Sequence, residues 1–300
     1  MTLADARTLL ADARAGRYAL PAFNVNNLEF AQAVVGAAAD EGTPIFVAVS
    51  EGAWAYGGDA LPRLALDLIA ATPVPLVLHL DHGSGLDAAR RAVAAGFNSI
   101  MVDGSARPYE ENVALAKAAV AAFAPGGVAV EAELGHVGGA GDPGVYTEPE
   151  KAAAFVAATG CHSLAVAVGT SHGAYKFAGE PTLDLERLAL IAAATPVPLV
   201  LHGASAVYAD VVAALERAGG AFAGARGLPD ALLAAAVDRG VAKVNVDTDL
   251  RLAFAASVRA TLAGDAAALD PKKILGAARD AVRAMARRRI RACRPAAGQK

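Results

Sequence analysis

Three histidines, His82, His172 and His202, each come at or just after the end of a short apolar run. Neutral imidazole is a preferred zinc ligand, and a catalytic zinc site uses three protein ligands while keeping a further position open. The spacing of the three histidines along the chain is not a metal-binding motif in itself. The prediction of a catalytic Zn2+ site therefore depends on a fold that brings the ends of these runs together.

The other three histidines fit structural roles better. His162 precedes an apolar run instead of following one, and His136 lies in a glycine-rich segment. His79 shares a strand face with Asp81, two residues further on, so we expect it to support a metal ligand and not to be one.

The apolar runs alternate with longer segments of helical periodicity, which is the pattern of βα units around a parallel sheet. A length of 300 residues without a break in composition suits one α/β barrel. We predict the fold class α/β, as a (β/α)8 TIM barrel over residues 1–300 with an extra C-terminal helix at 270–294. The predicted strands are 20–24, 44–49, 76–81, 99–103, 128–133, 163–168, 199–202 and 243–247.

Polar residues gather at the carboxyl ends of all these predicted strands, where barrels of this kind carry their chemistry. They are Asn24, Ser50, Asp81, His82, Asp103, Glu131, Glu133, Ser171, His172, His202, Asn245 and Asp247. Since side chains alternate along a strand, Asn245 and Asp247 share a face, as do His79 and Asp81. We expect these faces to point into the mouth of the barrel, because the opposite faces must pack against helices.

The composition narrows the possible partners. Hydrophobic residues make up 55% of the chain, and a net charge of −3 gives no reason to expect nucleic acid. No apolar run suits a membrane span, and the amphipathic first segment lacks the apolar core of a signal peptide, so no membrane partner is expected. Two cysteines suit a reducing compartment, so we expect a cytoplasmic protein.

Two segments lie at or just after the ends of the last two predicted strands, where barrels commonly bind phosphate. Their residues are Gly203, Ala204, Ser205, Asn245, Val246, Asp247 and Thr248. Small side chains let backbone N–H groups approach an anion, and the positive end of a following helix adds attraction. A phosphorylated substrate is therefore predicted.

Five motifs, in order along the chain, resemble the class II, metal-dependent fructose-bisphosphate aldolases. They are LHLDHG (78–83), VEAELGHVGG (130–139), VGTSHGAYKF (168–177), LHGAS (201–205) and KVNVDTDLRLAF (243–254). The segments PAFNVNNLEF and SEGAWAYGG are similar to the same family. The likeness runs from about residue 2 to the C-terminal helix.

The resemblance implies a retro-aldol cleavage of fructose 1,6-bisphosphate to dihydroxyacetone phosphate and glyceraldehyde 3-phosphate, a reaction of glycolysis and gluconeogenesis. It implies that the three rim histidines hold the catalytic metal, which polarises the substrate ketone. It also implies that Asp81 exchanges a proton with the C4 oxygen of the sugar. Asp103 and Glu133 match the ligands of a second divalent ion.

The resemblance also implies a set of substrate contacts. Those to dihydroxyacetone phosphate are Gly173, Gly203, Ala204, Ser205, Asn245, Val246, Asp247 and Thr248. Gly173 and Gly203 also match positions around a monovalent cation, Na+ or K+, and Asn24 and Ser50 fit contacts to substrate hydroxyls. Members of the family are dimers or tetramers, so a homodimer or homotetramer is expected.

Two positions depart from the family pattern. Gly141 stands where relatives carry a loop glutamate that moves the C3 proton, and Asp142 or Glu148 are the candidates to replace it. Lys272 stands where relatives often bind the distal phosphate with arginine, and lysine keeps the charge without the bidentate geometry.

Three alternatives remain open at this point. A tagatose-1,6-bisphosphate aldolase shares all these motifs. A sugar-phosphate-binding relative would keep the metal site and lack turnover. Schiff-base chemistry through Lys176 or Lys243 is disfavoured, because such a lysine needs a desolvated or cationic setting and the histidines predict a metal.

Overall fold

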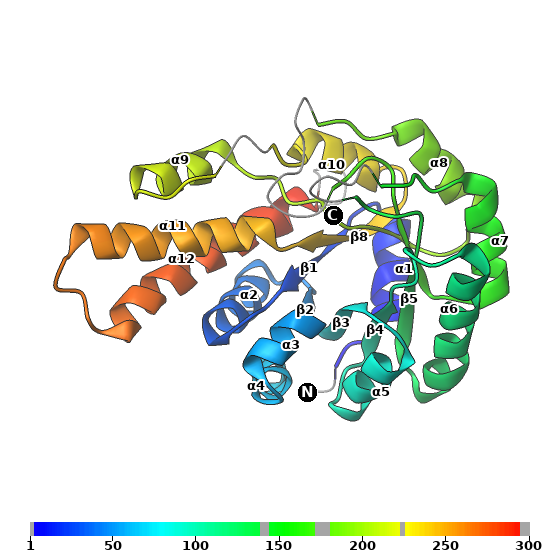
Figure 1. Cartoon of the computed structure of the whole chain (residues 1–300), viewed down its shortest axis with the longest axis horizontal. Helices are drawn as coiled ribbons and strands as arrows, with labels where there is room; N and C mark the ends of the chain where they lie inside the picture. The colour runs from blue at the N-terminus through cyan, green and yellow to red at the C-terminus, as the bar shows by residue number, and fades with distance from the viewer. Residues whose placement is uncertain (1–2, 139–143, 172–180, 223–225, 295–300) are drawn as a thin grey trace.

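The computed structural model describes residues 3–138, 144–171, 181–222 and 226–294. Within these residues, eight parallel strands close into a barrel in chain order from β1 to β8 (Figure 1). The strands are β1 (Leu20–Asn24), β2 (Phe46–Ser50), β3 (Val77–Gly83), β4 (Ser99–Val102), β5 (Ala129–Leu134), β6 (Ser163–Val166), β7 (Leu199–Leu201) and β8 (Val241–Val246). The predicted (β/α)8 barrel is confirmed.

Helices lie around the barrel, and most of them cover its outer face (Figure 1). They are α1 (Ala6–Gly16), α2 (Leu28–Glu41), α3 (Glu51–Gly57), α4 (Ala60–Ala71), α5 (Leu86–Ala94), α6 (Tyr109–Phe123), α7 (Pro149–Thr159), α8 (Leu185–Ala194), α9 (Ala209–Arg217), α10 (Asp230–Val237), α11 (Thr248–Gly264) and α12 (Pro271–Ala292), with a short 3-10 turn at Ala124–Gly126. None of the helices in the described residues combines the length and apolar composition needed to cross a bilayer.

The alternation of side chains along each strand divides the core in two. On β3, Leu78 and Leu80 point outward and pack in the large cluster between the strands and their helices. Val77 belongs instead to a smaller cluster that also contains Leu10 and Ala13 of α1. Helix α1 therefore closes the amino-terminal end of the barrel, and the carboxyl ends of the strands form its mouth.

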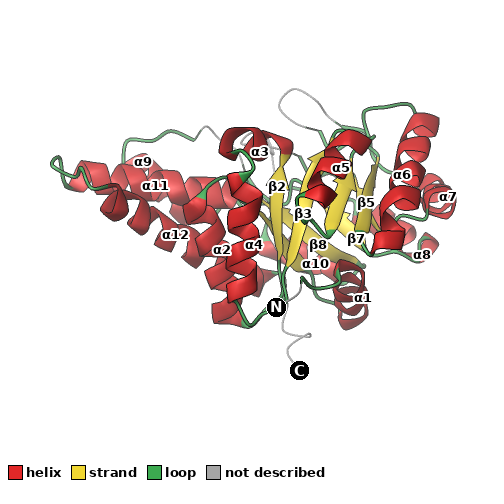
Figure 2. Ribbon diagram, turned by 90° about the horizontal axis from the view of Figure 1, so that it is seen from below, coloured by secondary structure: helices red, strands yellow, loops and turns green. Residues whose placement is uncertain are grey.

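The last two helices form a long hairpin that extends away from the barrel (Figures 1 and 2). Helix α12 packs on α11 and α2, as expected for the predicted terminal helix. Ion pairs reinforce this packing, since Arg283 binds Asp40 at 2.6 Å and Arg287 binds Glu41 at 2.7 Å.

Strand ends differ from the predictions by a few residues, and two connections differ in kind. Two helices, α3 and α4, follow β2. Helix α9 begins only at Ala209 and lies along α11, so no helix starts directly after the 203–205 segment (Figure 1). The helix end predicted beside that segment is therefore absent among the described residues, whereas α11 begins at Thr248 as expected.

Candidate active site at the mouth of the barrel

Asp81 lies at the centre of the mouth, buried and held by two amides. Its Oδ2 atom accepts a hydrogen bond from Asn24 Nδ2 and its Oδ1 atom accepts one from Asn245 Nδ2, each at 2.7 Å. Burial by itself would raise the pKa of Asp81, but the positive charges of His82 and His202 outweigh it and lower the pKa to about 2. The carboxylate is thus ionised and fixed in orientation at neutral pH.

His82 lies beside Asp81 because the strand is irregular at this point. The register of β3 against β4 shifts between Leu80 and Gly83, and His82 has a φ of 49°. A regular strand would send neighbouring side chains to opposite faces. The irregularity instead lets both Asp81 and His82 line the same cavity.

His202 follows β7 and meets His82 across the mouth, with ring centroids 4.5 Å apart. Ligand atoms of Asp81, His82 and His202 lie within 4.8 Å of one another. His172 lies outside the described residues. The structure thus brings together two of the three predicted histidines, next to the predicted catalytic carboxylate.

A second group of atoms that could hold a metal ion shares His82. Its Nδ1 atom is 2.7 Å from Asp103 Oδ2, and atoms of His82, Asp103 and Glu133 also lie within 4.8 Å of one another. Burial would raise the pKa of Asp103, but the hydrogen bonds from His82 and Ser105 lower it. Burial would lower the pKa of His82, but the charge of Asp81 and the hydrogen bond to Asp103 raise it to about 9.

Glu133 is the least compensated group of this cluster. Its Oε1 atom accepts a hydrogen bond from the N–H of Val137 at 3.4 Å, and its buried Oε2 atom has no hydrogen-bond partner among the described residues. Burial and the nearby charge of Asp103 raise the pKa of Glu133 to about 8. A carboxylate oxygen left in this state is a ready ligand for a cation.

The barrel interior below the mouth contains a buried polar network. Lys243 Nζ donates to Glu131 Oε2 at 2.7 Å and lies 3.0 Å from His79 Nε2. Glu131 Oε1 lies 3.0 Å from His202 Nε2. His79 belongs to this network and contacts no predicted metal ligand directly among the described contacts, and burial followed by the charge of Lys243 holds its pKa well below the usual value.

The segment after β7 presents backbone N–H groups to the cavity. Within the described residues, the N–H groups of Gly203, Ala204 and Ser205 make no hydrogen bond to protein acceptors. Gly203 has a φ of 64°, and a Cβ atom there would lie 2.5 Å from the carbonyl oxygen of Ser171. The position therefore requires glycine. The Ser205 hydroxyl accepts from the N–H of Asp247 at 3.4 Å, which joins the two predicted phosphate segments.

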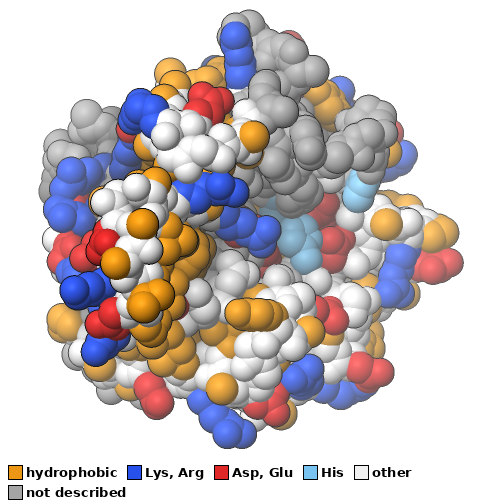
Figure 3. Space-filling model, turned by 60° about the vertical axis from the view of Figure 1, so that its left-hand side comes forward, with side chains coloured by type: hydrophobic (Ala, Val, Ile, Leu, Met, Phe, Trp, Pro, Cys, Tyr) orange, Lys and Arg blue, Asp and Glu red, His pale blue; other side chains and the backbone are white. Residues whose placement is uncertain are grey.

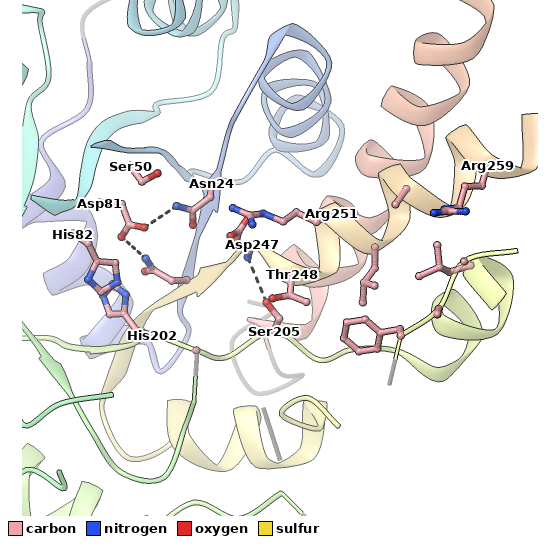
Figure 4. A pocket seen from close by; sticks show the side chains of 18 residues that line it. Asn24, Ser50, Asp81, His82, His202, Ser205, Asp247, Thr248, Arg251 and Arg259 are labelled. Atoms are coloured by element: carbon pink, nitrogen blue, oxygen red, sulfur yellow. Dashed lines mark hydrogen bonds and ion pairs between the residues drawn. The ribbon is translucent and has the colours of Figure 1, made fainter. Parts of the chain in front are cut away.

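One cavity of about 510 Å3 joins Asp81, His82 and His202 to the segment after β7 and the start of α11 (Figure 4). Its lining includes the predicted residues Asn24, Ser50, Asp81, His82, His202, Gly203, Ser205, Asn245, Asp247 and Thr248. In Figure 3, histidine and acidic side chains lie on one side of a hollow and basic side chains on another. The side chains of Ala204 and Val246 are buried and lie outside the lining.

Two arginines of α11 that sequence reasoning missed also line this cavity. Arg251 binds Asp247 at 2.7 Å, and Arg259 lies at the far end from the histidines (Figure 4). The signal was present in the sequence, because Asp247 and Arg251 are four residues apart at a helix start and Arg259 follows about two turns later on the same face.

Lys272 does not reach this cavity within the chain, contrary to its predicted contact with the distal phosphate. Its side chain is 88% exposed and lies 3.7 Å from Asp270 at the start of α12. The reason is the length of α11, whose 17 residues extend about 25 Å away from the mouth. Arg251 and Arg259 are the basic side chains that line the cavity instead.

Several predicted positions lie outside the described residues: Gly141, Asp142, His172, Gly173 and Lys176. Glu148, the other candidate for the missing loop acid, precedes α7 and pairs with Lys151 at 3.0 Å. Lys243, the other Schiff-base candidate, is fully buried below the mouth and bound to Glu131.

Comparison with known proteins agrees with this geometry. Residues 4–298 match the family model described as fructose-bisphosphate aldolase class-II. A fructose-bisphosphate aldolase of Thermus caldophilus is 45% identical, with 94% of this chain and 95% of that protein covered, and one of Giardia intestinalis is 39% identical, with 97% and 93% covered. The crystal structure of the YdjI aldolase from Escherichia coli K12 has a TM-score of 0.81 at 32% identity and covers 97% of each chain. The chain therefore belongs to the class II fructose-bisphosphate aldolases, a family of metal-dependent lyases.

Proposed function

We propose that this enzyme cleaves fructose 1,6-bisphosphate reversibly to dihydroxyacetone phosphate and glyceraldehyde 3-phosphate, with zinc as its catalytic metal. The observation that carries the proposal is the position of Asp81. This ionised carboxylate, held by two amides, lies beside two histidines in a cavity that also contains N–H donors and two arginines. Acid–base, metal and anion-binding groups thus share one space of about 510 Å3, large enough for a sugar bisphosphate.

The residues present fit a divalent cation. The orphaned Oε2 atom of Glu133 and the close approach of His82 to Asp103 supply oxygen and nitrogen donors in a site with no lysine or arginine among its described ligand groups. His82 and His202 would hold the catalytic ion, and His172 completes the set by resemblance. Nitrogen-rich ligands favour zinc. When bound, such an ion acts as a Lewis acid toward the substrate ketone.

We assign a second divalent position to His82, Asp103 and Glu133, whose ligand atoms lie within 4.8 Å of one another. A monovalent cation, Na+ or K+, is proposed near Gly203 and Gly173 on the resemblance. Both ions would reduce the negative charge that phosphate binding brings to the mouth.

Asp81 moves the proton at the C4 oxygen in this proposal. With its pKa lowered to about 2, the carboxylate accepts the hydroxyl proton when the C3–C4 bond breaks and returns it in condensation. Asn24 and Asn245 fix the direction of both oxygens, and positioned acid–base catalysis contributes about 10²–10⁴-fold. Asp142 or Glu148 takes the place of a glutamate at position 141 in moving the C3 proton, and Asp142→Ala and Glu148→Ala distinguish the two by loss of turnover.

The two phosphates are assigned to two neighbouring groups of donors that line the cavity. The N–H groups of residues 203–205 make no hydrogen bond to the described part of the chain, and together with Asp247 and Thr248 at the start of α11 they suit the phosphate of dihydroxyacetone phosphate. Arg251 binds Asp247 at 2.7 Å and lies near Asn24, on the same side of Asp81 as Asp247, and it suits the distal phosphate (Figure 4). Guanidinium groups favour this role because they bind phosphate in bidentate geometry.

The proposal is tested by supplying fructose and tagatose 1,6-bisphosphates side by side to the zinc-loaded protein in an assay that detects dihydroxyacetone phosphate. We expect faster turnover of the fructose substrate, loss of activity with a chelator, and loss of about 10²–10⁴-fold in Asp81→Asn. Faster turnover of tagatose bisphosphate would assign the rival substrate. Binding of dihydroxyacetone phosphate without cleavage of either sugar would identify a binding protein, and borohydride trapping would revive the Schiff-base alternative.

We also propose that the protein forms a homodimer or homotetramer. Lys272 lies too far along the hairpin to reach the cavity of its own chain, so any substrate contact by Lys272 requires a second copy. An apolar groove of about 420 Å3 on the hairpin, lined by Ala253, Ala256 and Met285 among others, offers a surface for that copy. The cytoplasmic location expected from the sequence is compatible with two buried, unpaired cysteines.

Light scattering measures the oligomeric state, and mixed oligomers test the trans contact. Chains carrying Lys272→Glu and chains carrying Asp81→Asn should each be impaired alone. In a mixed oligomer, one cavity would combine an intact Asp81 with an intact Lys272, and a low KM should return. A monomer in solution, or mixed oligomers without recovery, would contradict this arrangement.

A further inference from the structure

The connection after β7 is held from below by a buried carboxylate. Asp249, in the first turn of α11, is 1% exposed. Its Oδ2 atom accepts a hydrogen bond from the N–H of Ala206 at 2.8 Å, and its Oδ1 atom accepts one from the N–H of Val207 at 2.7 Å. The two N–H groups directly following the 203–205 segment therefore point away from the cavity and into α11.

The backbone at this point adopts a conformation that its sequence does not favour. Val207 has a φ of 50°, although the left-handed region is unfavourable for a β-branched residue. Such a conformation persists where surrounding contacts impose it. The bidentate contact with Asp249 is the contact that fixes this peptide and the turn that leads into it.

A buried arginine from the C-terminal helix completes the arrangement. Arg289 of α12 is fully buried, and its Nη2 atom donates to the carbonyl oxygen of Ala204 at 3.1 Å. Its Nε atom lies 3.4 Å from Asp249 Oδ2, and its Nη1 atom donates to Asp230 at 2.8 Å and to the Tyr208 hydroxyl at 3.2 Å. One guanidinium thus joins the loop, α10 and α11.

The pair acts on opposite groups of the same short loop. Arg289 holds a carbonyl oxygen of the 203–205 segment on the side away from the cavity, and Asp249 holds the next two N–H groups. A peptide whose C=O is fixed outward has the N–H of the following residue directed the other way, toward the cavity. The N–H of Ser205 is the one that this contact orients.

We propose that Asp249 and Arg289 are positioning residues that hold the 203–205 backbone ready to bind the phosphate of the substrate. This inference rests on the proposed function, which assigns a phosphate to those N–H groups. Neither residue lines the cavity, so they act through the loop and not by touching substrate. The C-terminal helix, remote in sequence from the barrel, is thereby built into the anion site.

The experiment compares Arg289→Lys with Arg291→Lys in the zinc-loaded, full-length protein. Arg291 lies on the same helix, but its side chain is 62% exposed and binds Glu41. Lysine retains the buried charge of Arg289 but cannot reach both Ala204 and Asp249. Inorganic phosphate serves as the probe of the anion site, and its inhibition constant is measured together with KM, kcat, zinc content and Tm.

For Arg289→Lys we expect the inhibition constant for phosphate and the KM for fructose 1,6-bisphosphate to rise about tenfold, equivalent to about 1.4 kcal/mol. We expect kcat to stay within about threefold and zinc content to be unchanged, because the metal and acid–base groups lie elsewhere. Asp249→Asn should show the same pattern, because it keeps the shape of the side chain and weakens one of the two N–H contacts. Arg291→Lys should match the wild type.

Four results would overturn the inference. The first is a fall in Tm with unchanged KM and phosphate inhibition, which would make the pair merely structural. The second is a parallel loss of kcat and zinc. The third is failure of both Arg289→Lys and Asp249→Asn to fold, which would mean that the pair is needed for the stability of the whole barrel and not for the 203–205 loop in particular. The fourth is an effect of equal size in Arg291→Lys. A wild-type protein that cleaves neither sugar bisphosphate would instead refute the proposed function.

Discussion

Two glutamates of one strand, Glu131 and Glu133 on β5, are equally buried but have opposite surroundings. Glu131 lies in the barrel interior, where Lys243 and His202 contact its two oxygens at 2.7 and 3.0 Å. Glu133 lies at the mouth, where one oxygen has no hydrogen-bond partner among the described residues and burial raises its pKa to about 8.

The charge of Glu131 is compensated by the chain itself, whereas compensation of Glu133 depends on a cation from solution. A buried charge is tolerated when it is paired and hydrogen-bonded, and the interior achieves this with a lysine of the chain itself. At the mouth, Asp103 and Glu133 have no such lysine partner among the residues that the structure describes. We infer that the interior is built for stability and that the mouth is completed only when it binds metal and substrate.

The largest expected effect comes from removing the interior cation. Lys243→Met should leave Glu131 as an uncompensated buried charge and lower the free energy of unfolding by about 3–5 kcal/mol. Urea denaturation of the metal-loaded protein measures this loss. The double variant Lys243→Met with Glu131→Gln should recover part of the stability, because it removes the unpaired charge. A loss below about 1 kcal/mol in the single variant would mean that Lys243 is not needed to compensate the buried charge of Glu131.

The next effect concerns pH and the metal-free mouth. The folded pKa of Glu133 is about 8 against an ordinary 4.5, so the folded protein binds the extra proton between these values and its stability falls as pH rises through that range. His82, raised from 6.5 to about 9, stabilises the fold below pH 6.5 and loses this contribution as pH approaches 9. Both effects have the same sign between pH 6.5 and 8.

Thermal melting in a chelator measures this slope. The Tm of the metal-free protein should fall from pH 6 to pH 9, corresponding to a loss of a few kcal/mol in the free energy of unfolding. Bound zinc should make Tm depend less on pH. Glu133→Gln should remove its share of the slope, because the amide does not titrate. A metal-free Tm that is constant or rises over this range would contradict the picture of an unbalanced mouth.

A smaller effect compares the two carboxylates that hold the metal-site histidines. Asp103 contacts His82 at 2.7 Å and Glu131 contacts His202 at 3.0 Å. Asp103→Asn and Glu131→Gln should each weaken zinc binding by about 10–100-fold, since carboxylate partners orient ligating histidines. Chelator competition measures this affinity. Glu131→Gln should destabilise the metal-free fold more than Asp103→Asn, because it also leaves the buried Lys243 without its carboxylate. Equal stability losses in both variants would remove the distinction between interior and mouth.

The smallest effect is expected at Ser50, which serves both the fold and the cavity. Its Oγ atom accepts from the N–H of Ala53 and caps α3, and the residue also lines the cavity. Ser50→Ala should cost about 1 kcal/mol of stability and raise KM modestly. Ser50→Thr, which retains the capping oxygen, is the matched control in melting and kinetic assays. An unchanged KM in Ser50→Ala would leave the residue as a cap alone.

The periodicity of apolar and polar residues was sufficient to predict the barrel and part of the site. The alternation of His79 and Asp81 with Leu78 and Leu80 predicted which side chains face inward, because this property depends only on neighbouring residues. The same alternation could not predict that His82 would join Asp81, because a register shift and a φ of 49° break the period there. Strand periodicity alone would have placed His82 on the outer face.

The sequence by itself determined the eight βα units, the polar residues at the strand ends and the family. Only the tertiary structure decided which of these residues meet. Lys243 and Glu131 are 112 residues apart, and Ala204 and Arg289 are 85 apart, so their contacts depend on barrel closure and on the return of α12. For the same reason Lys272 lies out of reach of the cavity, since the long helix α11 places it far from the mouth. Side-chain chemistry follows from local sequence, whereas charge pairing in a barrel depends on distances that no local pattern encodes.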